Sequence, residues 1–219
     1  MVHNGTPVPG AAVGVVQASR TYTTFFGPQD IATDADGRFA IQNVNPDDDH
    51  YVYGTMDSLK RLGSLPAKKV RAGADRTDLD VGDLEVKPGY KLAGRVVLAD
   101  GKAVPPGTRA QLSRSEAWDT QIVVLGPDGK FSFEGLPPEG HSFHVAVRGY
   151  RLSRRNESLD TRNLNGLVGR IVGDDVGVRI LLEPGEPERY DYSKRTTREE
   201  VEARRRVEQS PIRGIPGDS

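Results

Sequence analysis

The chain of 219 residues contains no cysteine. Disulfide bonds, thiolate metal sites and cysteine nucleophiles are therefore excluded. Aromatic residues make up only 6% of the chain, so few rings remain for a binding surface once a core is filled. No stretch approaches the roughly 20 consecutive apolar residues of a membrane-spanning helix, so we expect no membrane insertion.

Neither sign of charge is in excess. The chain has 30 basic and 31 acidic side chains, with a formal net charge of −1. This balance lacks the basic surface typical of nucleic-acid-binding proteins, so no nucleic-acid partner is expected. The 25 glycines and 15 prolines, by contrast, are typical of short strands joined by tight turns.

Three short motifs occur twice along the chain. Val8, Phe39 and Pro88, each within a similar local sequence, return as Val104, Phe131 and Pro184, at offsets of 96, 92 and 96 residues. A period this long matches a small domain duplicated in tandem. The repeat predicts one domain over residues 1–89 and a second over 90–186, followed by a charged tail over 187–219.

Alternation of apolar and polar residues predicts short β-strands in both copies. Asp36-Gly37 and Asp128-Gly129 are hairpin signals, because glycine accepts a positive φ without a Cβ clash. About seven short strands in each copy describe an antiparallel β-sandwich, so the predicted fold class is all-β with two tandem sandwiches. Strands are expected at residues 12–17, 38–41, 50–53, 68–71 and 83–86, and again at 90–97, 109–112, 121–125, 130–133, 144–147 and 178–182.

Three segments depart from the repeat. The strand at Tyr90–Val97 has no counterpart in the first copy, because Met1 aligns with Val97. Either the first domain does without this strand or the chain is a piece of a longer protein. Residues 150–167 are polar and predict a long connection containing at most a short strand. In the tail, Thr196 or Thr197 with Glu200 predicts a capped but polar helix, which we expect to be marginal and mobile.

The repeated motifs resemble those of the carboxypeptidase regulatory-like domain. The sequence over 33–44 contains Asp36-Gly37-Arg38-Phe39 and leads into a proline-containing turn, and residues 126–140 carry the same signature. The resemblance covers residues 4–185 and implies a transthyretin-like, seven-stranded sandwich related to the B repeats of bacterial adhesins. Such domains serve as accessory or spacer modules of exported proteins. Some adhesin relatives form a Lys–Asn isopeptide bond. Lys91 stands on the matching first strand here, but the last strand has no asparagine, so no such bond is expected.

The histidines and aspartates that could bind a metal ion have simpler explanations. His141 and His144 are three residues apart, and on a strand such residues face opposite sides of the sheet. Asp34, Asp36 and the run at 47–49 offer carboxylates suited to calcium, but turn chemistry accounts for them. We therefore predict no metal site and no cofactor.

No serine has the surroundings of a catalytic nucleophile. Ser153, Ser158 and Ser193 lack the nucleophile-elbow motif of hydrolases. Residues 10–14 lack the spacing and the lysine of a phosphate-binding loop. We therefore predict no catalytic residue.

Exposed aromatic side chains could stack on a sugar ring. Trp118, the only tryptophan, is the predicted ligand-binding residue if the chain binds carbohydrate, with its neighbours on the Ser115–Gln121 segment. Tyr22, Phe25, Phe26 and Tyr51 are further candidates. Tyr51 aligns with Phe143 and Phe39 aligns with Phe131, which favours a core position for these four residues.

The sequence thus predicts a non-catalytic interaction or spacer module of an exported or envelope-associated bacterial protein. The expected location is extracytoplasmic, and the expected partner is a protein or another component of the cell envelope. A carbohydrate-binding module that uses Trp118 is the alternative.

Overall fold

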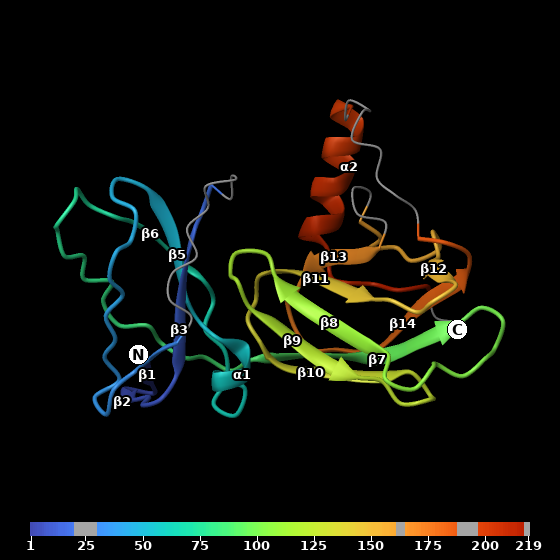
Figure 1. Ribbon diagram of the computed structural model, residues 1–219, viewed down its shortest axis with the longest axis horizontal. Helices are drawn as coiled ribbons and strands as arrows, with labels where there is room; N and C mark the ends of the chain where they lie inside the picture. The colour runs from blue at the N-terminus through green and yellow to red at the C-terminus, as the bar shows by residue number, and fades with distance from the viewer. Residues whose placement is uncertain (20–29, 161–164, 188–196, 217–219) are drawn as a thin grey trace. The chain divides into compact units, whose positions relative to one another are not determined.

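The computed structural model describes residues 1–19, 30–160, 165–187 and 197–216. They divide into two compact units. Unit 1 comprises Met1–Tyr90, Arg114–Asp119 and Glu134–Glu139, and unit 2 comprises Lys91–Ser113, Thr120–Phe133 and Gly140–Ser219. The described residues form short strands in several sheets, with two short helices (Figure 1). The predicted all-β fold class is confirmed.

Unit 1 is built around one antiparallel sheet with the strand order β4-β3-β5-β6. Alternation of valine and small residues along β3 places Val13 and Val15 in a buried cluster with Val52 of β5. The strands are β1 (Val2–His3), β2 (Thr6–Pro7), β3 (Ala12–Gln17), β4 (Ile31–Ala32), β5 (Asp49–Gly54) and β6 (Lys68–Arg71), and helix α1 (Met56–Leu59) follows β5.

Unit 2 holds two four-stranded sheets, with strand orders β10-β7-β14-β12 and β13-β11-β8-β9. The first and last strands of the repeat, β7 and β14, lie side by side in parallel, and the other pairings for which a register is available are antiparallel. The strands are β7 (Tyr90–Leu98), β8 (Arg109–Arg114), β9 (Thr120–Val124), β10 (Lys130–Leu136), β11 (Gly140–Val145), β12 (Tyr150–Leu152), β13 (Gly166–Arg170) and β14 (Asp175–Pro184).

Phenylalanine rings fill the core of unit 2. Phe131 and Phe133 project from β10, and Phe143 projects from β11 in the other sheet. The Phe131 and Phe143 ring centroids are 5.1 Å apart, and those of Phe133 and Phe143 are 6.1 Å apart. These contacts join the inner faces of two sheets, which is the packing expected of a β-sandwich.

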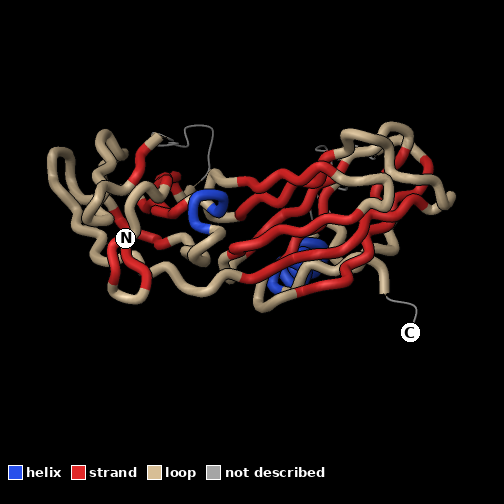
Figure 2. The backbone as a smooth tube through the Cα atoms, turned by 90° about the horizontal axis from the view of Figure 1, so that it is seen from below, coloured by secondary structure: helices blue, strands red, loops and turns tan. Residues whose placement is uncertain are grey.

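Two predicted strands of the first copy are absent as strands. The Asp36-Gly37 turn forms, with Gly37 at φ +71° and its N–H donating to the Asp34 carbonyl at 3.0 Å. Residues 38–41 nevertheless pair with no other strand, so the strand prediction there is wrong. The strand predicted at 83–86 is reduced to single bridges at Glu85 and Lys87. Figure 2 shows how much more of unit 1 than of unit 2 is loop. A strand needs a paired neighbour, and these segments have almost none.

The polar segment 150–167 also differs in part from its prediction. It contains all of β12 and the start of β13, so it contributes to two strands rather than to one short strand at most.

The C-terminal tail is partly helical and partly docked. Helix α2 (Arg198–Gln209) begins with the predicted capping box, in which the Glu200 N–H donates to Thr197 Oγ1 at 3.2 Å and the Thr197 N–H donates to Glu200 Oε2 at 2.8 Å. The prediction of a mobile tail is wrong for residues 210–215. Ile212 is 1% exposed, the Arg170 N–H donates to the Ser210 carbonyl, and the Ile215 N–H donates to the Arg179 carbonyl. One buried isoleucine and these backbone bonds fix the segment on unit 2.

Candidate functional site

The most deeply buried charge among the described residues is the Arg114 guanidinium in unit 1. Its side chain is inaccessible to solvent and donates five hydrogen bonds within unit 1. Nε donates to Glu139 Oε1 at 2.7 Å and Nη2 to Glu139 Oε2 at 3.1 Å, which is a bidentate pair. Nη1 donates to the Gly54 carbonyl at 2.8 Å and Nη2 to the Leu65 carbonyl at 3.0 Å. A fifth bond joins Nη1 to Asp119 Oδ2 at 3.3 Å.

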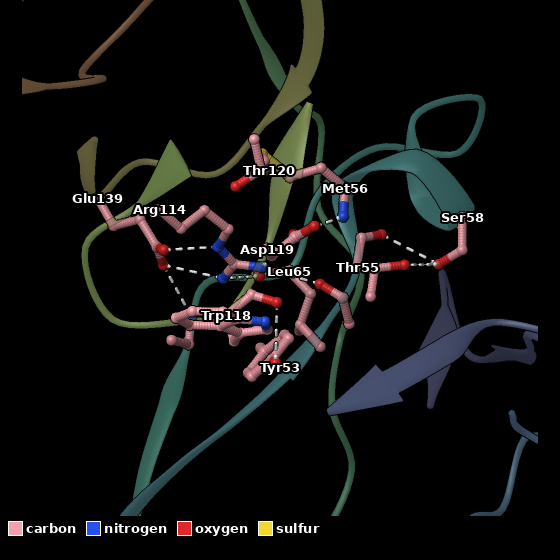
Figure 3. Close-up of polar contacts among 12 residues, drawn as sticks. Tyr53, Thr55, Met56, Ser58, Leu65, Arg114, Trp118, Asp119, Thr120 and Glu139 are labelled. Carbon is pink, nitrogen blue, oxygen red and sulfur yellow. Dashed lines mark hydrogen bonds and ion pairs between the residues drawn. The ribbon is translucent and has the colours of Figure 1, made fainter. Parts of the chain in front are cut away.

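Both carboxylates of this cluster also accept from the backbone. The Ala67 N–H donates to Glu139 Oε2 at 2.8 Å, and the Met56 N–H donates to Asp119 Oδ2 at 2.8 Å. Figure 3 shows the guanidinium enclosed by these groups. Since a guanidinium has five N–H donors, every donor position is matched by a bond inside unit 1. The cluster has no spare donor for a substrate, so we interpret it as a structural clamp.

The pKa values of Arg114 and Asp119 are both raised, for different reasons. Burial by itself would lower the pKa of Arg114, but the hydrogen bonds and charges of Glu139 and Asp119 outweigh it, so this pKa is raised. Burial raises the pKa of Asp119, and the Met56 N–H and the Arg114 charge offset this only in part. Arg114 therefore stays positively charged. Keeping the buried Asp119 carboxylate ionised, by contrast, has a net cost in free energy.

The clamp positions the loop that carries Trp118. The Arg114 N–H donates to the Asp119 carbonyl at 3.0 Å, which closes the loop, and Ala117 is buried against Val16 and Tyr53. The Tyr53 hydroxyl donates to the Trp118 carbonyl at 3.2 Å. The Trp118 side chain is left 59% exposed on a fixed turn. The only predicted ligand-binding residue thus lies at the surface of unit 1.

Tyr53 links this loop to the sheet of unit 1. Its ring lies beneath the Arg114 guanidinium, with 5.4 Å between the guanidinium carbon and the ring centroid. The ring also lies across β3 at Gly14, where a Cβ would collide with it. Glycine is therefore required at this strand position for the ring to reach Arg114.

The other aromatic candidates do not join Trp118 in one exposed platform among the described residues. Tyr51 is partly buried and packs with Val16, Tyr53 and Ala117, and Phe39 is partly buried against the core of unit 1. Phe131 and Phe143 are buried at 5% and 0% exposure. Tyr22, Phe25 and Phe26 lie outside the described residues.

The histidines and aspartates considered as metal ligands either lie apart or already bond to other groups of the protein. Along β11, His141 is buried and His144 is partly exposed, so the two side chains face opposite sides of the strand, as predicted. Asp34 Oδ1 accepts from the Asp36 and Arg38 N–H groups in the hairpin turn. Asp49 pairs with Lys69 at 2.7 Å, and this hydrogen bond lowers the pKa of Asp49. Within the described ranges, no three histidine or acidic side chains gather in a way that could hold a metal ion.

The serines have structural roles where the structure describes them. Ser153 Oγ accepts from the Arg155 N–H, and Ser158 Oγ donates to the Pro211 carbonyl and accepts from the Arg213 N–H. Both residues are buried, and Ser158 helps to dock the C-terminal segment. Ser193 lies outside the described residues.

A groove of about 600 Å³ in unit 2 was not anticipated from the sequence. Its volume is in the range of small-molecule sites. Apolar side chains of Val145, Val147 and Leu182 line it together with the polar groups of Arg109 and Tyr150. The Tyr150 hydroxyl is already committed to Asp100 Oδ2 at 2.8 Å. The lining residues that the structure describes include no aspartate, glutamate or serine.

Comparison with known proteins adds little to these observations. No family model matches the chain, and no curated protein sequence matches it. Among solved structures, the minor pilin GBS52 of Streptococcus agalactiae is similar over 89% of each chain, at 14% identity and a TM-score of 0.34. A streptococcal ancillary pilin matches 81% of this chain and 58% of its own, at 12% identity and a TM-score of 0.37. The shaft pilin SpaA of Lactobacillus rhamnosus GG matches 86% and 90%, at 12% identity and a TM-score of 0.30.

At TM-scores this low, the likeness to the pilins carries no argument about the role of this chain. The resemblance to the carboxypeptidase regulatory-like domain stays a prediction. No helix among the described residues is both long and apolar enough to cross a membrane.

Proposed function

We propose that the chain is a non-catalytic interaction or spacer module, made of two transthyretin-like β-sandwich domains over residues 1–89 and 90–186. It would serve an exported or envelope-associated bacterial protein outside the cytoplasm, whether periplasmic, cell-surface or secreted. Its partner would be a protein or another envelope component. The observation that carries the non-catalytic part of this proposal is the Arg114 clamp, because all five donors of the most buried charge in the described chain are bonded within unit 1 and none is left for a substrate.

A spacer of two domains makes a mechanical prediction. Pulling the chain from its two ends in a single-molecule force experiment should give two separate unfolding events. Each event should release roughly 300 Å, because about 90 residues extend by up to ~3.6 Å each. A single event that released the whole chain at once would contradict the two-domain spacer.

A carbohydrate-binding module is the second candidate, and one observation favours it. Trp118 is 59% exposed on a loop that the clamp holds in place, and an exposed ring on a fixed loop can stack on a sugar. A glycan array should separate the two functions. Binding by the parent chain that is lost in Trp118→Ala and kept in Val124→Ala, which removes another exposed apolar side chain, would favour the carbohydrate module. An array without signal would leave the spacer function in place.

A further inference from the structure

We propose that strand β9 of unit 2 pairs with the same strand of a second copy of this chain. The two strands run antiparallel about a two-fold axis at Ile122, and they join the sheets β13-β11-β8-β9 of both copies into one continuous sheet. This inference rests on the proposed interaction function, and it gives that function a surface and a partner.

Strand β9 has a neighbouring strand on one side only. It is the last strand of its sheet and pairs with β8. At the two ends of this pairing, the Leu125 N–H donates to the Thr108 carbonyl at 2.8 Å, and the Arg114 N–H donates to the Asp119 carbonyl at 3.0 Å. Along an antiparallel strand, residues whose backbone groups point to the partner alternate with residues whose groups point away. The odd-numbered residues over 119–125 are therefore the ones that bond to β8.

The even-numbered residues of β9 direct their backbone groups to the open edge. They are Thr120, Ile122 and Val124, and among the described residues no strand lies on that side to bond with them. Their side chains are exposed on the outer face of the sheet, with Ile122 at 51% and Val124 at 65%. A row of unpaired N–H and C=O groups beside exposed apolar side chains is a template for another strand.

The other edge strands of the four-stranded sheets are protected against such pairing. Strands β4 and β12 have only two and three residues, and β6 and β10 carry charged side chains such as Lys69 and Lys130. Strand β13 is covered by the C-terminal segment, since its Arg170 N–H donates to the Ser210 carbonyl. Short length, charge and cover are the means by which proteins block edge pairing. Strand β9 has five residues, no charge and no cover among the described residues, which indicates an interface.

The backbone of β9 is complementary to itself. When two copies run antiparallel with Ile122 opposite Ile122, Thr120 of each copy stands opposite Val124 of the other. All the edge-facing residues then lie in hydrogen-bonded pairs, which gives about six backbone bonds between the copies. A shift of the register by two residues lowers this number to about four. The register centred on Ile122 is therefore the preferred one.

The side chains also suit pairing between identical strands. The two Ile122 side chains are neighbours on the outer face, and β9 brings no charge to the contact, so no like charges repel each other there. Arg109 of β8 stands opposite Val124 of its own chain. Across the joined sheet the two copies of Arg109 are roughly 20 Å apart, which is well beyond the Debye length of about 8 Å.

The pairing is closed and weak. Each copy uses its open edge in the contact, so association stops at a dimer and does not continue into a filament. Two short strands bury less area than a permanent interface does, so the dimer dissociates on dilution.

Sedimentation equilibrium of the full chain over a range of concentrations tests the proposal. We expect a reversible monomer–dimer equilibrium. Ile122→Lys places like charges opposite each other at the two-fold axis and should raise the dissociation constant at least about tenfold. The side chain is exposed, so the variant should fold, and its urea midpoint checks this. Val172→Lys adds the same charge at another exposed valine and should change the dissociation constant less than about twofold.

A charge swap tests the register. Ile122→Glu alone should also weaken the dimer, but an equimolar mixture of Ile122→Glu and Ile122→Lys should associate at least about tenfold more tightly than either variant alone. Such a rescue requires residue 122 of one copy to lie against residue 122 of the other.

Amide hydrogen exchange followed by NMR reports on the edge itself. The Ile122 N–H is bonded only in the dimer, so its exchange should slow as the protein concentration is raised. The Val123 N–H already bonds to β8 in the monomer and should change much less, which makes it the internal control.

Four results would overturn the pairing of β9 with a second copy. A chain that stays monomeric up to about 1 mM, with fast exchange at Ile122, would leave the edge to a strand of another protein. Slow exchange at Ile122 in the dilute monomer would mean that the chain covers the edge itself. Equal effects of the two lysine variants, or a mixture that associates no more tightly than its components, would place the contact elsewhere. None of these results changes the number of unfolding events when a single molecule is pulled, so a failure of the pairing and a failure of the spacer function are distinguishable.

Discussion

The two units contain the same turn and differ in what lies beside it. Asp36-Gly37 and Asp128-Gly129 both form tight turns, with glycine φ values of +71° and +70°. After the second turn the chain continues as β10, with alternate residues buried, whereas after the first it forms no strand. The local sequences are alike, so the difference comes from the neighbour. A segment with strand propensity becomes a strand only where another strand pairs with it.

The two units are also stabilised by different kinds of interaction. Unit 2 encloses three phenylalanine rings between two four-stranded sheets. Unit 1 has one four-stranded sheet, a small β-ribbon and a core of mostly aliphatic side chains, to which the Arg114 clamp adds a fully bonded ionic centre. Unit 1 should therefore depend on hydrogen bonding, and unit 2 on packing.

The sharpest test of this contrast is Arg114→Met, which keeps much of the volume but removes every donor. Glu139 and Asp119 are then left buried without their cation, and breaking a buried ion pair in this way costs about 3–5 kcal/mol. We expect the urea unfolding transition of unit 1 to shift to lower concentration by that free energy. Tryptophan fluorescence of Trp118 reports on unit 1. Arg109→Met, on the same strand but exposed, is the matched control and should cost less than about 0.5 kcal/mol. An equal effect of the two changes would contradict the clamp.

Equivalent phenylalanines should differ in their contribution to stability. Phe131→Ala removes a buried ring that contacts two others and should cost about 3–5 kcal/mol in unit 2. Phe39→Ala, at the equivalent place in unit 1, should cost only about 1–2 kcal/mol, because part of that ring already faces water. Chemical denaturation of each variant, followed by NMR signals from both units, measures the pair. Equal losses would show that residues 39–44 are as well covered as β10.

Some of the structure could be predicted from local sequence, and some could not. The strands at 12–17, 68–71 and 90–97 were correctly predicted from alternation, since each has a partner strand in the fold. Alternation at 38–41 is just as regular, but no pattern within those residues reveals whether a neighbour is present. The sequence analysis missed the docking of Ile212 for a related reason. A single apolar residue among prolines and glycines forms no periodic pattern that would indicate burial.

The clamp could have been found in part. Ala110, Leu112 and Arg114 share one face of β8, and two of these three residues are clearly apolar, so alternation places Arg114 on the buried side. A buried arginine needs carboxylates, but its partners Glu139 and Asp119 lie 25 and 5 residues away in loops without a distinctive pattern. The exposure of Trp118 was expected, and its role in binding stays a prediction.

The smallest effect concerns the acidic partner of the clamp. Burial raises the pKa of Asp119 above its ordinary value of 3.8, so the native chain holds this proton to a higher pH than the unfolded chain does. Between these two pKa values the native state binds more protons at Asp119, so the contribution of this group to stability falls as the pH rises from about 4 and levels off above the raised pKa. In Asp119→Asn this contribution disappears, while the amide oxygen can still accept from the Met56 N–H, so the cost near neutral pH should be at most about 1 kcal/mol. The urea midpoint of unit 1 in the parent, relative to that in the variant, should therefore fall between about pH 4 and pH 7. Asp75→Asn, an exposed change, should leave the parent's pH dependence intact. If the urea midpoints of the parent and of Asp119→Asn changed equally with pH, burial would not raise the pKa of Asp119 in the native chain. The clamp would then hold the ionised carboxylate without a net cost in free energy.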